Sequence, residues 1–179
     1  LNLFLINFFT LSFFLIFLFR KLKEEKKIKI YFCYGWLFGF GYFLSNLYWI
    51  TISLTFEKDF IFLIPIVLIL IPSFLALFYS LVSVFFYFFN PKNILSAFFT
   101  FSFLFGITEF LRGIIFTGFP WNLFVYSFSN NLNFISILSI IGTYSLNLIV
   151  ISIFTVPALY VLRKSKKEII ICTLLLFLP

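Results

Sequence analysis

Residues 108–127 read TEFLRGIIFTGFPWNLFVYS and hold the one acidic and the one basic side chain that lie inside an apolar run. A charged side chain at the centre of a bilayer costs roughly 2.5–3.5 kcal/mol on insertion scales, so such residues call for a role. Glu109 and Arg112 are three residues apart and would share one helix face, with Arg112 leaning back over Glu109. The stretch therefore predicts a membrane helix that carries an ion pair and ends in a Gly-Phe-Pro-Trp turn.

The composition excludes an ordinary soluble domain. Hydrophobic residues make up 63% of the 179 residues, only 11% are charged, and the mean hydropathy is +1.17. Soluble chains carry about 25% charged residues. The net charge of +7 lies in short clusters between apolar runs, which argues against nucleic-acid binding and indicates topology signals. The 33 Phe are typical of an AT-rich genome, so a single aromatic residue carries little information about function.

Apolar runs separated by short polar stretches predict an all-α polytopic membrane protein, a bundle of about six transmembrane helices with the last one truncated. A signal peptide is the competing interpretation of the first run, but that run has no basic segment before it. Because the chain holds no Met and begins with Leu, we expect it to be a fragment. The expected spans are residues 1–19, 30–56, 60–89, 94–118, 134–162 and 169–179.

The charges of the connecting stretches predict the topology. Cytoplasmic loops of membrane proteins carry an excess of Lys and Arg. We therefore place the positive connections inside and the others outside, with residues 119–133 at the outer interface as a re-entrant or surface-lying segment. The sums are +4 for residues 20–29, −1 for 57–59, +1 for 90–93, 0 for 119–133 and +3 for 163–168.

Small residues in the second span predict a close helix contact. Gly35 and Gly39 are four residues apart, as are Gly41 and Ser45, so each pair forms a small face that another helix can approach. Metal chemistry is not expected, because the chain has no His, and Cys33 and Cys172 lack partners at metal-ligand spacing. We predict no metal and no cofactor.

Two motifs at the centre of the chain closely resemble the bacterial apolipoprotein N-acyltransferase family. They are EFLRG at residues 109–113 and TGFPW at 117–121, followed by Tyr126 and Ser127. Further similar positions are the Gly-Phe-Gly of residues 39–41, Trp49, Gly142 and Asn147. The resemblance covers roughly residues 30–179.

The resemblance implies eight membrane spans and a nitrilase-like domain, outside the cytoplasm, between the last two. In that family a Glu-Lys-Cys triad takes an acyl chain from a phospholipid as a thioester and passes it to the diacylglyceryl cysteine of a lipoprotein. By this resemblance we expect the chain to lack the family's first span and to stop where the nitrilase-like domain would begin, and we therefore expect no catalytic residue of the family in it. We expect a multi-pass protein of the bacterial inner membrane, inactive alone, with a phospholipid donor, a lipoprotein substrate and a separately encoded nitrilase-like domain as partners.

The candidate lipid-groove residues are Trp49, Glu109, Arg112, Trp121 and Tyr126. Two interpretations of the charged pair stay open: an internal clamp between helices, or an Arg112 that meets a lipid phosphate while Glu109 holds it. For the aromatic residues the alternative is packing and interfacial anchoring. Alternative functions of the chain are a small multipass transporter or channel, and a non-functional remnant of a split gene.

Overall fold

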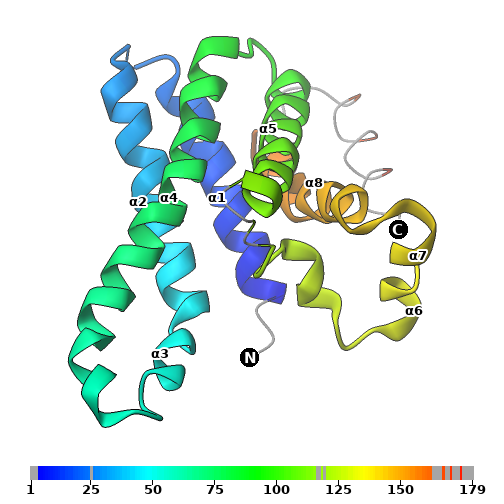
Figure 1. Cartoon of the computed structure of the whole chain (residues 1–179). Coiled ribbons are helices and arrows are strands. Elements are labelled where there is room, and N and C mark those ends of the chain that lie inside the picture. Colours follow the sequence, from blue (N-terminus) through cyan, green and yellow to red (C-terminus); the bar gives the residue numbers. More distant parts are fainter. Residues whose placement is uncertain are drawn as a thin grey trace. The chain divides into compact units, whose positions relative to one another are not determined.

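The computed structural model describes residues 4–24, 26–115, 118, 120–162, 167, 170 and 174. Within these residues every regular element is a helix, which confirms the predicted all-α class (Figure 1). The chain divides into two compact units, Leu1–Lys26 with Phe85–Pro179, and Lys27–Val84.

Three helical stretches of the described chain are long and apolar enough to cross a membrane: Lys58–Phe89, Ile94–Ile114 and Thr143–Leu162. Helix α1 (Phe4–Lys21) covers the run expected to be the first span, and α2 (Ile28–Leu47) begins the second. Most of the expected last span, residues 169–179, lies outside the described residues. The count of about six spans therefore stays a prediction.

In the unit Lys27–Val84, helix α2 packs closely on α4 (Ile64–Phe89). A Cβ atom on Gly35 would lie 2.6 Å from Ser80 Cα, and one on Gly39 would lie 2.9 Å from Ala76 Cα. The predicted close contact through Gly35 and Gly39 is confirmed. Gly41 does not take part, because no described atom lies within 4 Å of the corresponding Cβ position.

Two expected spans are not single helices. In the stretch expected as the second span, residues 30–56, helix α2 ends at Leu47. The short helices α3 (Ile50–Ser53) and η1 (Lys58–Leu63) follow it and lead into α4. In this stretch the Thr51 and Thr55 hydroxyls donate to backbone carbonyls three residues earlier, at 2.7 Å each, and such local bonds compete with helix geometry.

The stretch expected as one span at 134–162 contains α6 (Leu132–Ile135), α7 (Leu138–Ile141) and α8 (Thr143–Leu162). The break before α8 has a backbone cause. Gly142 has φ +81°, a left-handed conformation that glycine adopts readily and that ends a helix. The continuous membrane-length helix therefore begins at Thr143.

The other unit is built around α8, which packs against both α1 and α5 (Ile94–Ile114) (Figure 1). Asn93 is the N-cap of α5, and its side-chain oxygen accepts a hydrogen bond from Ser96 N at 2.7 Å. Phe101, Phe105 and Phe154 are fully buried between the three helices. A hydrogen bond from Ser12 Oγ to the Phe154 carbonyl, at 2.8 Å, also joins α1 to α8.

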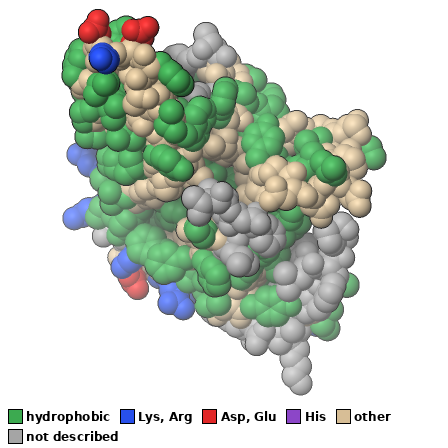
Figure 2. All heavy atoms as spheres, turned by 90° about the horizontal axis from the view of Figure 1, so that it is seen from below, with side chains coloured by type: hydrophobic (Ala, Val, Ile, Leu, Met, Phe, Trp, Pro, Cys, Tyr) green, Lys and Arg blue, Asp and Glu red, His purple; other side chains and the backbone are tan. Residues whose placement is uncertain are grey.

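Charged side chains gather near the ends of the helices. Lys21 at the end of α1 pairs with Glu24 at 2.6 Å, and its hydrogen bond and charge hold the pKa of that carboxyl below its ordinary value. In the space-filling view the charged side chains form separate groups, and the surface between them is hydrophobic or uncharged (Figure 2). Glu109 and Arg112 differ from these groups, because both side chains are buried.

Candidate functional site

The last two turns of α5 hold a buried ion pair. Arg112 Nη2 donates to Glu109 Oε2 at 2.5 Å, and the exposed fractions are 1% for Arg112 and 0% for Glu109. The spacing of three residues places both side chains on one face, as the sequence predicts. Arg112 also lies in the final turn of the helix, where the backbone dipole favours a cation.

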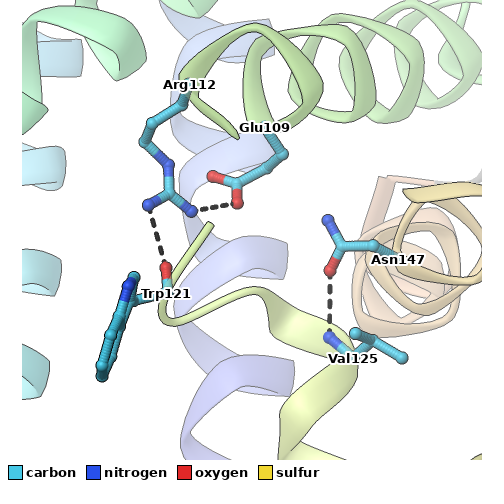
Figure 3. A network of polar contacts seen from close by, with 5 residues as sticks. All are labelled: Glu109, Arg112, Trp121, Val125 and Asn147. Atoms are coloured by element: carbon cyan, nitrogen blue, oxygen red, sulfur yellow. Dashed lines mark hydrogen bonds and ion pairs between the residues drawn. The ribbon is translucent and has the colours of Figure 1, made fainter. Parts of the chain in front are cut away.

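The same guanidinium reaches beyond its own helix. Its Nη1 donates to the Trp121 carbonyl at 2.9 Å, while Nη2 faces Glu109 (Figure 3). The planar guanidinium of Arg can serve two acceptors in fixed directions, which an ammonium group cannot do in the same geometry. Arg112 thus joins the end of α5 to the segment that follows it.

We call residues 120–128 the cap segment. It contains the short helix η3 (Phe124–Phe128), and its Leu123, Phe124 and Val125 side chains are buried. The Phe124 ring lies between those of Phe105 and Phe154, with ring centroids 6.3 and 6.5 Å away. The sequence predicted a re-entrant or surface-lying segment here. The middle part of the segment packs into the three-helix core, and its location relative to a membrane stays a prediction.

Two further polar side chains hold the cap segment. Asn147 on α8, which is fully buried, accepts a hydrogen bond from Val125 N through Oδ1 at 2.9 Å (Figure 3). Asn7 on α1 donates through Nδ2 to Ser127 Oγ at 2.8 Å. Helices α1, α5 and α8 therefore all supply polar contacts to this segment.

The structure places four of the five candidate residues in this region. Glu109 and Arg112 are buried beneath the cap segment, and Trp121 and Tyr126 lie on it with exposed fractions of 53% and 44%. Trp49 belongs to the other unit, where it is exposed in the turn between α2 and α3. Its place in a shared lipid groove stays a prediction.

Asn7 and Asn147 were not among the candidate residues predicted from the sequence. The available signal was an amide side chain inside an apolar run, since polar residues in membrane helices usually face the bundle interior. No group of three or more His, Cys, Asp or Glu that could hold a metal ion occurs in the part of the chain that the structure describes.

Residues 1–156 match the family model described as the apolipoprotein N-acyltransferase N-terminal domain. The chain belongs to this family. An apolipoprotein N-acyltransferase of Rickettsia bellii is 43% identical over 122 residues, which are 68% of this chain and 24% of the relative. The corresponding protein of Brucella melitensis is 36% identical over 126 residues, or 70% of this chain and 24% of the relative.

A third relative, the apolipoprotein N-acyltransferase of Sinorhizobium medicae, is 34% identical over 146 residues, or 79% of this chain and 25% of the relative. The chain thus spans about a quarter of the length of these curated relatives. No solved structure matches it. The family inferred from the EFLRG and TGFPW motifs is confirmed. The EFLRG motif supplies the ion pair of Glu109 and Arg112. The TGFPW motif ends at Trp121, whose carbonyl accepts a hydrogen bond from Arg112.

Gly118 of the TGFPW motif should resist substitution more than Gly142. Both have φ +81°, but a Cβ on Gly118 would overlap the Gly113 carbonyl oxygen, whereas no described atom lies within 4 Å of the Gly142 position. We expect Gly118→Ala to lower the free energy of unfolding by about 2 kcal/mol and Gly142→Ala by about 1 kcal/mol. Denaturant unfolding in detergent measures both. Equal losses would mean that the Gly113–Gly118 turn is not as close as described.

Proposed function

We propose that this chain is the membrane domain of an enzyme of the bacterial inner membrane that moves an acyl chain from a phospholipid to the diacylglyceryl cysteine of a lipoprotein. The family and the names of the relatives support the reaction. In this proposal the catalytic groups belong to the part of the relatives that this chain does not cover. The chain alone is therefore inactive in this proposal, and a nitrilase-like domain completes it.

The observation that carries a specific role is the attachment of the cap segment to the buried ion pair. Arg112 holds the Trp121 carbonyl from below, and the Trp121 and Tyr126 side chains are about half exposed above it. Trp and Tyr suit the headgroup level of a bilayer, because each ring combines an apolar body with a polar group. In our proposal the cap segment borders the site where the donor phospholipid enters.

Arg112 acts in this proposal as a clamp and not as a phosphate ligand. Both of its terminal nitrogens already donate hydrogen bonds inside the protein, and the side chain is buried. A lipid phosphate would have to displace the Trp121 carbonyl to reach Nη1. Glu109 balances the guanidinium charge, so the helix buries a neutral pair and not an isolated cation.

The test uses the complete protein in phospholipid vesicles, with a diacylglyceryl peptide as acceptor. We expect Trp121→Ala to lower kcat/KM for the phospholipid about tenfold, equivalent to about 1.4 kcal/mol of transition-state stabilisation. The unfolding midpoint should change little, because the Trp121 ring is half exposed. Phe103→Ala is the control, since Phe103 is an exposed aromatic residue in the middle of the same helix as Arg112.

Equal effects of Trp121→Ala and Phe103→Ala would contradict a lipid site at the cap segment. Absence of acyl transfer by the unaltered complete protein, with both substrates present, would contradict the proposed reaction itself. The two failures are separate, because the first compares variants of an active enzyme.

A further inference from the structure

The two exposed aromatic residues of the cap segment have separate polar attachments. Arg112 holds the carbonyl of Trp121 itself. On either side of Tyr126, Asn147 accepts from Val125 N at 2.9 Å and Asn7 donates to Ser127 Oγ at 2.8 Å. We propose that Asn7 and Asn147 are positioning residues for the lipid site, acting by holding Ser127 and Val125, the two neighbours of Tyr126. This inference rests on the proposed function.

The local structure around Tyr126 needs such support. Helix η3 is a 3-10 helix of five residues, and its internal bonds include Tyr126 N to the Leu123 carbonyl at 3.1 Å. Short 3-10 helices have poorer hydrogen-bond geometry than α-helices, so their orientation depends on contacts outside the helix. The buried Phe124 and Val125 side chains fix one face, and the two Asn contacts fix the direction in which Tyr126 points.

Burial of the Asn147 amide would be energetically unfavourable if this position served only for apolar packing. Its Oδ1 must face Val125, because a backbone N–H can only donate, and this fixes the orientation of the amide. Its Nδ2 is also buried and has no hydrogen-bond partner in the ranges that the structure describes. A buried polar group of this kind is disfavoured in an apolar helix unless its hydrogen bond, here with Val125 N, has a role.

Asn7 gives α1 a role beyond membrane anchoring. Its side chain is buried, and the residue it binds lies 120 positions later in the sequence. Helix α1 is itself held to α8 through the hydrogen bond from Ser12 to the Phe154 carbonyl. The position of Ser127 is therefore set by α1 and that of Val125 by α8, two helices that are fixed to each other.

The experiment compares Asn147→Leu, Asn147→Asp and Asn7→Leu in the complete protein. Asn147→Leu removes the acceptor at similar volume, whereas Asn147→Asp keeps an oxygen for Val125 N. The control is Ser152→Ala, because the Ser152 hydroxyl donates to the Leu148 carbonyl of its own helix at 2.9 Å and belongs to no cap contact. The readouts are hydrogen exchange of the Val125 amide and the kinetics of acyl transfer against phospholipid concentration.

We expect Asn147→Leu to accelerate exchange of the Val125 amide, and to raise KM for the phospholipid about fivefold to tenfold, as the loss of one hydrogen bond would, with a smaller change in kcat. Asn147→Asp should restore much of the protection of the amide. Asn7→Leu and Ser127→Ala should each raise KM, and the double variant should be no worse than the worse single one, because both remove the same bond. Ser127→Ala also removes this bond with a minimal change in volume, should Asn7→Leu fail to fold.

Faster exchange with unchanged KM would overturn the inference, because the Asn contacts would then be structural only. Unchanged exchange in Asn147→Leu would overturn it as well. If the unaltered protein shows no acyl transfer, the proposed reaction fails, and phospholipid retention measured by native mass spectrometry replaces the kinetics. Equal retention by Asn147→Leu and the unaltered protein would then contradict the positioning role.

Discussion

An Arg112→Leu variant is expected to lose about 3–5 kcal/mol of stability, the typical result of removing one partner of a buried ion pair. The change leaves the Glu109 carboxylate buried without its cation and removes the donor at the Trp121 carbonyl. Denaturant unfolding of the protein in detergent, followed by circular dichroism, measures the loss. The cap segment should become more accessible to solvent at the same time, because its attachment to α5 depends on the Arg112 side chain.

Two comparison variants separate charge from geometry. Arg112→Lys keeps the charge but not the planar fork, and should recover only part of the stability. A double Glu109→Leu and Arg112→Leu variant should be more stable than Arg112→Leu alone, because neither charge then remains buried. If Arg112→Leu instead keeps its full stability and only raises KM for the phospholipid, Arg112 contacts the lipid phosphate and the clamp interpretation fails.

The local part of this site could be predicted from the sequence. Glu109 and Arg112 meet because residues three apart on a helix are neighbours whatever the rest of the fold does. The contact between Arg112 and Trp121 crosses a turn, and that from Asn7 to Ser127 crosses 120 positions. Such contacts depend on how helices pack, and the spacing of residues carries no information about them.

Hydropathy predicted where apolar helices occur but not where they break. The run from 134 to 162 is apolar almost throughout, and the chain turns at Gly142 because of a backbone conformation that hydropathy does not measure. The cap segment shows another limit of composition. Its Asn, Ser, Trp and Tyr residues left a re-entrant and a surface-lying segment both open, and composition did not predict that Leu123, Phe124 and Val125 are buried in the core.

A Gly35→Ala variant should show the second large effect, a loss of about 3 kcal/mol, at the upper end of the cost of overpacking. The added Cβ would lie 2.6 Å from Ser80 Cα and closer still to the Tyr79 carbonyl oxygen. These are backbone atoms of α4, so α2 and α4 would have to move apart. Ser83→Ala should not rescue the variant, although Ser83 Oγ lies 2.6 Å from the same Cβ position, because the backbone overlap remains.

Gly41→Ala on the same helix is the matched control and should not lower stability. No described atom lies within 4 Å of its Cβ position, so the methyl group meets no obstacle. Ala is favoured over Gly in a helix interior by about 1 kcal/mol, and Gly41→Ala should therefore be neutral or slightly stabilising. Thermal unfolding of the two variants in the same detergent gives the comparison. An equal decrease of the unfolding temperature in both variants would mean that α2 and α4 are not in close contact at Gly35. A decrease in Gly35→Ala alone would identify Gly35 as the point of closest approach, which sets the distance between the two helices.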